Sequence, residues 1–369
     1  MFNGLLILAS AMVLSATLTP VVRTFALRLG VIDQPHPRKI HLTPVPRLGG
    51  LAMYVAFVVT VCIFAARLSE TTPNVWGQIL AVLGGATSLV LFGVLDDGGY
   101  LHSLTKLLLG MPIAALALAS GGIRVMAWPF VAYFDPHSFA FHAVSSVLTI
   151  LWIVTITSAF SILDHMDGLC SGVAAIAAAF FLLFAILEGQ SLVSILAAAV
   201  FGASVGFLFW NLKPASIFMG DSGALFLGFM MATLSIKMRF LPLPTSQSWT
   251  IPVLVLAVPI FDSVLVIVSR LRRGLNPLTT PGKDHTAHRL ANLGVGQRGA
   301  TYVLYGVGIA AGLLAWLVLS SSVTQTYWMM AAVVALGILA LVGLERWQRR
   351  AGGPHAPLRS GVTDDSGRS

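Results

Sequence analysis

Long apolar runs recur along the whole chain of 369 residues, and they limit its fold more than any other feature. An apolar stretch of about 18 residues or more can cross the hydrocarbon core of a bilayer as a helix. Hydrophobic residues make up 57% of the chain and charged residues only 10%. Because a soluble globular domain does not have this composition, the sequence predicts an all-α polytopic membrane protein.

The apolar runs predict eleven transmembrane helices in a single membrane domain, residues 1–346. Their ranges are 3–22, 49–67, 75–95, 104–120, 142–162, 169–187, 190–209, 219–237, 249–269, 299–319 and 326–345. No basic residue precedes the first run, whereas Arg23 and Arg28 follow it. We therefore expect a retained first helix with its N-terminus outside and a cytoplasmic C-terminus. The tail 347–369 is basic and then polar, which predicts disorder.

The distribution of basic residues supports this orientation. Of the 22 Lys and Arg residues, 18 lie near junctions that the orientation places in the cytoplasm; the other four are Arg67, Arg124, Lys237 and Arg239. Cytoplasmic loops of membrane proteins carry such an excess. It accounts for the net charge of +8 without a nucleic-acid partner. We expect a multi-pass protein of the inner (plasma) membrane.

Two carboxylates, Asp164 and Asp167, interrupt the apolar sequence between two predicted helices. An Asp at the bilayer centre costs roughly 2.5 to 3.5 kcal/mol, so such residues usually lie in a cavity or at an interface. If the stretch is helical, both side chains share one face and could bind one metal ion or polar ligand. The alternative is a loop in which the Asp residues cap helix ends.

Five more acidic residues also fall at predicted cytoplasmic junctions. With the first two they are Asp33, Asp96, Asp97, Asp164, Asp167, Asp221 and Asp284, whereas Asp262 lies inside a predicted helix. A site that binds a cation and phosphate needs such a cluster, and Mg²⁺ prefers oxygen ligands. Asp96 and Asp97 would point about 100° apart on a helix, so we expect different roles for them. The alternative is a pair of helix caps.

Basic and aromatic residues at the same junctions could bind the rest of an anionic substrate. They are Arg38, Lys39, Arg47, Lys106, Phe218, His285, His288 and Arg289. The two histidines do not favour zinc, because neither a cysteine nor a third histidine is near them in sequence; donors to phosphate oxygens fit better. The alternatives are a basic flank that only sets orientation, a Phe218 packed in the core, and an Asp262 that only bonds neighbouring helices.

Together these stretches resemble the family of polyprenyl-phosphate N-acetylhexosamine-1-phosphate transferases. The resemblance covers about residues 33–305. It rests on Pro46-Arg-Leu-Gly-Gly50, Asp96-Asp97, Asp164-His-Met-Asp167-Gly-Leu169, Asn211 with Pro214-Ala-Ser-Ile-Phe-Met-Gly-Asp221, and Asp284-His285-Thr-Ala-His288-Arg-Leu. The first stretch is more similar to the branch with simple N-acetylhexosamine donors, such as undecaprenyl-phosphate GlcNAc-1-phosphate transferases, than to the MurNAc-pentapeptide branch.

The resemblance implies that a polyprenyl phosphate attacks a UDP-sugar, that UMP leaves, and that a polyprenyl-diphospho-sugar remains. This would be the first membrane step of a cell-envelope glycan pathway. The implied cofactor is Mg²⁺, with Mn²⁺ as an alternative, and a homodimer is an option. The implied metal ligands are Asp221 and Asp164, and Asp167 is a second ligand or a donor-binding residue.

The remaining roles also follow from position in the family motifs. Asp96 is the expected base and Asp97 its partner, while Asn211 and Phe218 would hold the uracil. Four residues depart from the family pattern, which usually has Asn at 158 and 161, Gly at 165 and a third His at 287; they are Ser158, Ser161, His165 and Ala287. Since Ser lacks the amide donor pair of Asn, the identity of the sugar stays open.

Other membrane functions fit less well. A cation-coupled transporter, the alternative that we keep, predicts carboxylates within helices, and only Asp262 lies there. An intramembrane aspartyl protease would have Gly-x-Gly-Asp, but Phe218 occupies the first Gly position. A CDP-alcohol phosphotransferase would have Asp-Gly-x-x-Ala-Arg, which the stretch at Asp167 lacks.

Overall fold

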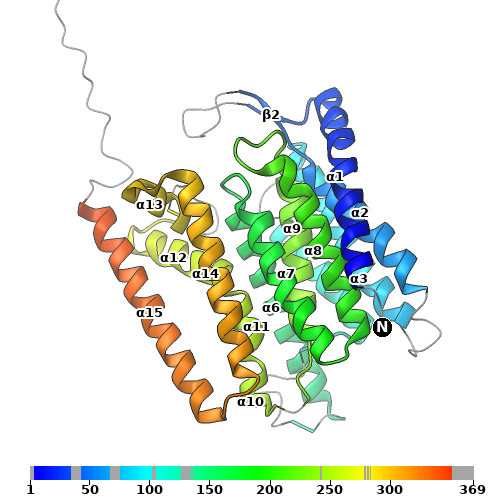
Figure 1. The fold of residues 1–369 in the computed structure, drawn as a ribbon, viewed down its shortest axis with the longest axis vertical. Helices are drawn as coiled ribbons and strands as arrows, with labels where there is room; N and C mark the ends of the chain where they lie inside the picture. The colour runs from blue at the N-terminus through cyan, green and yellow to red at the C-terminus, as the bar shows by residue number, and fades with distance from the viewer. Residues whose placement is uncertain are drawn as a thin grey trace, which may run out of the picture.

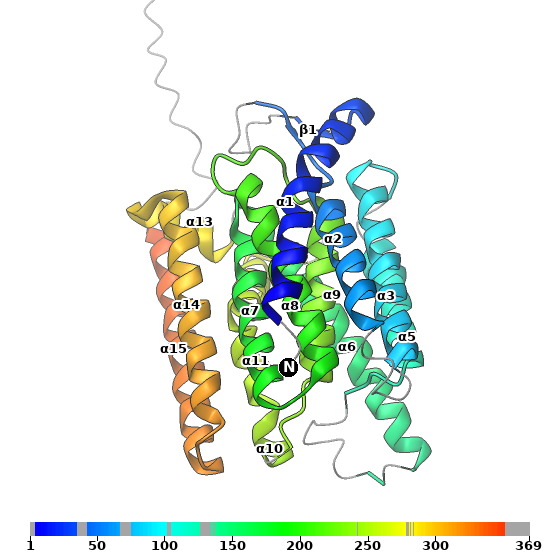
Figure 2. The same ribbon diagram turned by 45° about the vertical axis from the view of Figure 1, so that its right-hand side comes forward.

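The described part of the chain is a bundle of helices (Figures 1 and 2). The computed structural model describes residues 4–34, 43–66, 75–101, 105–125, 134–135, 137–241, 243–277, 280, 282 and 284–350. Its helices are α1 (Gly4–Leu29), α2 (Gly49–Ala65), α3 (Val75–Asp97), η1 (Lys106–Gly110), α5 (Met111–Ser120), α6 (Phe139–Leu163), α7 (Leu169–Leu187), α8 (Ser191–Asn211), α9 (Gly220–Lys237), α10 (Thr245–Ser248), α11 (Thr250–Val255), α12 (Ala257–Arg272), α13 (Thr286–Leu290), η3 (Ala291–Val295), α14 (Gly296–Val318) and α15 (Val323–Arg350).

The predicted all-α polytopic class is confirmed, and each of the eleven predicted segments contains a helix. Seven described helices are long and apolar enough to cross a membrane, and an eighth span results if the pair on either side of Leu256, bent by 76°, counts as one. The other three segments form α2, η1 with α5, and α9. Helix α2 and the η1–α5 segment are shorter, and α9 carries the charged residues Asp221 and Lys237. Eleven crossings therefore stay a prediction.

Two details differ from the sequence analysis. A short antiparallel ladder pairs β1 (Ile32–Asp33) with β2 (Val45–Pro46), so the described chain is not purely helical. Helix α15 continues to Arg350, four residues beyond the predicted domain boundary at 346. The rest of the predicted disordered tail, 351–369, lies outside the described residues.

Helix α9 is the centre of the bundle. Every residue from Ser222 to Ser235 is buried, and the helix packs against α2, α3, α6 and α7. Glycines allow two of these neighbours to approach its first turn. A Cβ atom at Gly50 on α2 would collide with Gly223, and one at Gly93 on α3 would collide with Ser222. Small residues at such contacts let helix backbones come close, so the start of α9 is held tightly.

The two sides of the bundle differ in burial. Helix α1 packs against α8, where Ser15 Oγ donates to the Ala203 carbonyl oxygen at 2.8 Å and Trp210 Nε1 to that of Ala16 at 2.9 Å. Helices α14 and α15 lie on the other side (Figure 2). Only Thr326 and Glu345 of α15 are buried. Its exposed apolar side chains suit a surface that faces lipid.

One end of the bundle collects the polar connections. The β ladder, the α8–α9 connection and α13 lie at the top of Figure 1, and α15 ends there, whereas Gly4 begins α1 toward the opposite end. Residues of these connections and of the α6–α7 turn line one common cavity. Functional side chains from distant parts of the sequence are therefore positioned at this end.

Candidate active site

A cavity of about 890 Å³ lies at this end of the bundle. The predicted site residues on its wall come from the first loop, α3, the α6–α7 turn, the end of α8, the α8–α9 connection, the start of α9, and α13. They are Arg47, Asp97, Asp164, Asp167, Asn211, Phe218, Asp221 and His288. The structure therefore brings together most of the predicted site. The exceptions are Asp96, Lys106, His285 and Arg289, which lie behind the lining, and Arg38 and Lys39, which lie outside the described residues.

A lysine joins two carboxylates behind the cavity wall. The Lys106 ammonium nitrogen lies 3.0 Å from Asp96 Oδ2 and 2.5 Å from Asp221 Oδ2. Ser161 Oγ donates to Asp221 Oδ1 at 3.1 Å. The pair of oxygens on Asp221 is thus held from α6 and from η1, while Asp221 itself lies in the first turn of α9. We call Asp96, Lys106 and Asp221 the carboxylate–lysine centre.

Asp97 uses both of its carboxylate oxygens to cap α9. They accept the backbone N–H groups of Asp221 at 2.9 Å and Ser222 at 3.1 Å. A carboxylate at a helix N-terminus satisfies unpaired donors and interacts favourably with the helix dipole. Gly220 has φ +71° and a Cβ atom there would collide with the Asp97 carboxylate. The expectation of different roles for the two neighbouring acids agrees with this geometry, because only Asp96 bonds Lys106.

The stretch from Asp164 to Gly168 is a turn, so the helical interpretation of the Asp pair is wrong. Asp164 directly follows the last residue of α6 as its C-cap, and Gly168, with φ +73°, precedes α7. Asp167 Oδ2 accepts the Ala215 N–H at 3.2 Å. Asp164 makes no hydrogen bond through its carboxylate within the described chain, and burial, with the negative charges of Asp221 and Asp97, raises its pKa to about 8.

Asn211 connects three backbone segments around the cavity. Its Oδ1 accepts the Gly168 N–H at 3.1 Å and the Ser171 hydroxyl at 3.2 Å, and its Nδ2 donates to the Ile217 carbonyl at 3.0 Å. It therefore braces the α6–α7 turn against the α8–α9 connection. Phe218 is half-buried on the cavity wall, and its backbone bonds that of Pro46 and Gly49. The predicted contact of Asn211 and Phe218 with uracil stays a prediction.

The predicted basic residues lie in unlike environments. Arg47 forms an ion pair with Asp33, and both line the cavity. Arg289 is only 1% exposed and braces α13 instead of facing the cavity. Its Nε donates to the Asp284 carbonyl at 2.9 Å, its Nη2 to Ser269 Oγ at 2.8 Å, and its Nη1 lies 2.8 Å from Glu345 Oε1. These contacts tie α13 to α12 and α15.

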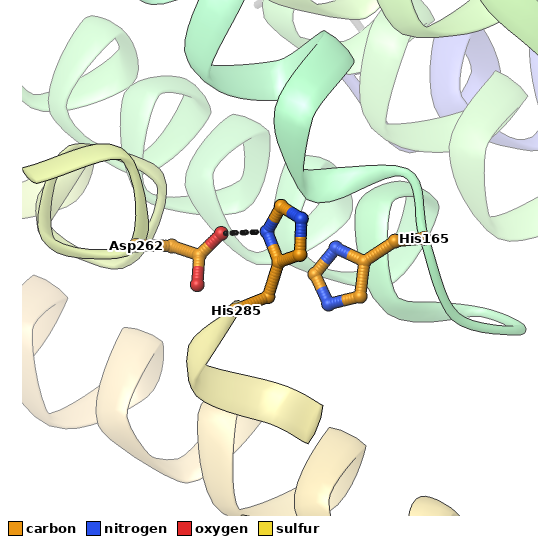
Figure 3. A group of neighbouring side chains, drawn as sticks. All are labelled: His165, Asp262 and His285. Carbon is orange, nitrogen blue, oxygen red and sulfur yellow. Dashed lines mark hydrogen bonds and ion pairs between the residues drawn. The ribbon is translucent and has the colours of Figure 1, made fainter. Parts of the chain in front are cut away.

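A third histidine does lie beside His285 and His288, contrary to the argument from sequence spacing. The His165 ring stacks on that of His285 with centroids 4.0 Å apart (Figure 3). It also lies 4.8 Å from the ring of His288. His285 Nδ1 donates to Asp262 Oδ2 at 3.0 Å, and Asp262 Oδ1 accepts the Thr286 N–H at 2.6 Å. Burial, followed by the charge of His285, lowers the pKa of His165 well below its usual value.

Sequence reasoning missed two basic residues of the cavity wall, Lys213 and Arg298. Arg298, in the first turns of α14, lines the cavity, and its Nη2 donates to the Lys213 carbonyl at 2.8 Å. Its position shortly after the His285–His288 stretch was the available signal. Ser161 also belongs to the site, although the sequence marked it only as a departure from the family pattern.

Comparison with known proteins decides the family. The model of glycosyl transferase family 4 matches residues 79–239. A probable undecaprenyl-phosphate N-acetylglucosaminyl 1-phosphate transferase of Bacillus subtilis (strain 168) is 33% identical over 323 residues, which cover 87% of this chain and 86% of the relative. This chain belongs to glycosyl transferase family 4. The resemblance drawn from the five sequence stretches is thereby confirmed.

Two more relatives of this family 4 protein show the breadth of the similarity. A decaprenyl-phosphate N-acetylglucosaminephosphotransferase of Mycobacterium tuberculosis is 31% identical, over 91% of this chain and 88% of the relative. A phospho-N-acetylmuramoyl-pentapeptide-transferase of Bacillus cytotoxicus is 32% identical, over 64% of this chain and 76% of the relative. The full-length similarity is thus to the transferases named for N-acetylglucosamine.

Proposed function

We propose that this protein transfers a sugar 1-phosphate, that of an N-acetylhexosamine, from a UDP-sugar to a polyprenyl phosphate and releases UMP. One observation carries the proposal. A cavity walled by carboxylates and basic side chains lies at the end of an apolar bundle, where a soluble nucleotide and a lipid phosphate can meet. The similarity to N-acetylglucosaminyl 1-phosphate transferases over most of the chain supports this assignment.

The donor set of the cavity fits Mg²⁺, with Mn²⁺ as an alternative. The candidate ligands are the oxygens of Asp221 and Asp164, and Mg²⁺ is commonly held by one or two carboxylates plus substrate phosphates. The Asp164 carboxylate has no hydrogen-bond donor among the described residues and lies near the charges of three other acids. A divalent cation would favour its ionised form. When bound, the ion would neutralise charge on the reacting phosphates.

The residues around these ligands would position both substrates. Lys106 fixes Asp221 and Asp96 relative to each other. Asp96 would orient the lipid phosphate or take its proton. Because a phosphate monoester has a second pKa near 6, it is largely a dianion at neutral pH and can attack directly. Arg47 and His288 on the wall would hold donor phosphate oxygens, since charged donors bind such oxygens strongly.

No observation in the described chain favours the transporter alternative. The acid that it requires inside a helix, Asp262, is hydrogen-bonded to His285 and to the Thr286 backbone. That carboxylate serves as a connection between α12 and the start of α13. It does not form a path with other acids.

The proposed topology places the cavity on the cytoplasmic face of the plasma membrane, with eleven spans. The positions of Gly4 toward one end of the bundle and of the cavity at the other support it. Single cysteines at Gln34, Gly98 and Thr280, in a background without Cys62, should resist an impermeant thiol reagent in intact cells. One at Asp135 should react. Labelling of the first three from outside would contradict the orientation.

A donor screen tests the proposed reaction. Purified protein in detergent receives Mg²⁺, undecaprenyl phosphate and one UDP-sugar at a time, and UMP is measured. We expect UMP with a UDP-N-acetylhexosamine only when the lipid phosphate is present. The Asp221→Asn variant, checked for the same elution volume and melting temperature, should form none. UMP formation that does not depend on the lipid, or none with any UDP-sugar, would refute the proposal.

A further inference from the structure

Beside the cavity lies a second group of side chains that can bind a metal, made of nitrogen as well as oxygen donors. His165 comes from the α6–α7 turn, Asp262 from α12, and His285 from the residue before α13 (Figure 3). Each offers a ligand atom within 4.8 Å of those of the other two. Asp262 and His285 are buried, at 1% and 6% exposure. Three segments far apart in sequence thus converge on one point.

The hydrogen bonds of the two histidines fix which ring nitrogen carries the proton. His165 Nδ1 lies 3.1 Å from the Ile162 carbonyl oxygen, which can only accept, so Nδ1 is the donor. His285 Nδ1 likewise donates to the Asp262 carboxylate. In His165 the lone pair is then on Nε2, whereas in His285 the nitrogen beside Asp262 carries a hydrogen. A histidine that binds a metal is commonly oriented as His165 is here, by a carbonyl on the other nitrogen.

The Nε2 atom of His165 is buried and has no hydrogen-bond partner within the described chain. A buried acceptor without a donor is costly, and the stacked imidazole of His285 offers it no N–H from its ring face. With Nδ1 bonded to the Ile162 carbonyl, this lone pair is available to a ligand. It is the kind of donor that a transition metal ion accepts.

We propose that His165, Asp262 and His285 form a binding site for a divalent transition metal ion of the zinc class. Two imidazoles and one carboxylate are borderline donors that suit zinc, whereas Mg²⁺ prefers oxygen ligands only. The ion takes the place of the hydrogen between His285 Nδ1 and Asp262 Oδ2, and that hydrogen moves to Nε2 of the same ring, so that the imidazole keeps one hydrogen and binds through Nδ1. Ligand atoms around tetrahedral zinc are about 3.4 Å apart, so the ligand atoms close in by roughly an ångström on binding. The His165 and His285 rings turn out of their stack at the same time, because the lone pairs of an imidazole lie in the ring plane.

The ion would cross-link the wall of the cavity. It joins the turn that carries Asp164 and Asp167 to α12 and to the start of α13. His288, whose ring lies 4.8 Å from that of His165, lines the cavity and is next to the proposed ligands. Metal binding at this site is therefore expected to stabilise the folded protein. The inference does not depend on the proposed reaction, because binding is measured directly.

The experiment uses the full chain in detergent, without a histidine tag and after chelator dialysis. Co²⁺ is titrated in the presence of excess Mg²⁺, which occupies the oxygen-rich site, and its visible absorption bands report nitrogen and oxygen coordination. Zn²⁺ binding is measured in parallel by metal analysis. The variants are His165→Ala and Asp262→Asn. The matched controls are His137→Ala, at an exposed histidine before α6, and Asp221→Asn, in the carboxylate–lysine centre.

We expect one bound equivalent in the wild type, a loss of affinity of about 10-fold or more in His165→Ala and Asp262→Asn, and no change in the two controls. Zn²⁺ should also raise the melting temperature of the wild type but not that of His165→Ala. If Asp262→Asn does not fold, the metal affinity of His165→Ala, at the less buried position, decides the test. Equal binding by all variants, loss only in Asp221→Asn, or no binding by folded wild type would overturn the proposal.

Discussion

Replacing Asp97 should reduce stability more than replacing its neighbour Asp96. The Asp97 carboxylate accepts two backbone N–H groups at the start of α9, the central helix of the bundle. A hydrogen bond to a charged group contributes roughly 1.5 to 3 kcal/mol. Asp97→Ala removes both bonds, so the expected loss in unfolding free energy is about 3 to 6 kcal/mol. Asp97→Asn keeps one carbonyl acceptor and should lose roughly half as much.

The assay is thermal unfolding of purified variants in detergent, followed by circular dichroism. The melting temperatures should fall in the order wild type, Asp97→Asn, Asp97→Ala. Asp96→Asn should melt close to the wild type, because Lys106 keeps Asp221 as a partner, yet it should lose turnover. An Asp97→Ala variant that melts like the wild type while Asp96→Asn is destabilised would refute the assignment of the cap.

The other predictions concern single contacts of the site. Lys106→Met leaves Asp96 and Asp221 close together without their shared cation, so it should lower the melting temperature, and adding Asp96→Asn should restore part of it. Phe218→Ala should raise KM for the UDP-sugar without a matching fall in kcat, since stacking on a base contributes about 1 to 3 kcal/mol. Glu345→Gln removes the charge beside Arg289. It should raise KM for the UDP-sugar while leaving the binding of the lipid unchanged. Labelled UMP should exchange into UDP-sugar only when the lipid-linked product is present; exchange without lipid would indicate a covalent aspartyl intermediate.

The helices could be predicted because their signals are local. Apolar length and the breaks between runs placed a helix on every predicted segment. The Asp164–Asp167 stretch could not be settled in the same way, because a three-residue spacing fits both a helix and a turn. Gly168 with its positive φ and the non-helical conformation of Asp164 make it a turn, and both conformations depend on packing against neighbouring segments.

Contacts between residues distant in sequence also could not be predicted. The sequence located the site at one end of the bundle, since acidic and basic residues fall at alternate junctions. It did not show that Arg289 forms an ion pair with Glu345, or that the His165 ring contacts those of His285 and His288. Those pairs are set by how α12, α13 and α15 pack, which no spacing within one segment reveals. Spacing in the sequence therefore indicated two histidines at this place, where the structure has three.

The fate of the sugar-linked phosphorus tests the central claim most directly. A UDP-sugar radiolabelled at the phosphorus bonded to the sugar is incubated with the protein, Mg²⁺ and polyprenyl phosphate, and the lipid is extracted. Transfer of a sugar 1-phosphate predicts that the label enters the lipid product in proportion to the UMP formed, and that both are absent with Asp221→Asn. Label that stays in the aqueous phase as UDP, with unlabelled sugar on the lipid, would mean that the sugar moves without its phosphate and would contradict the account.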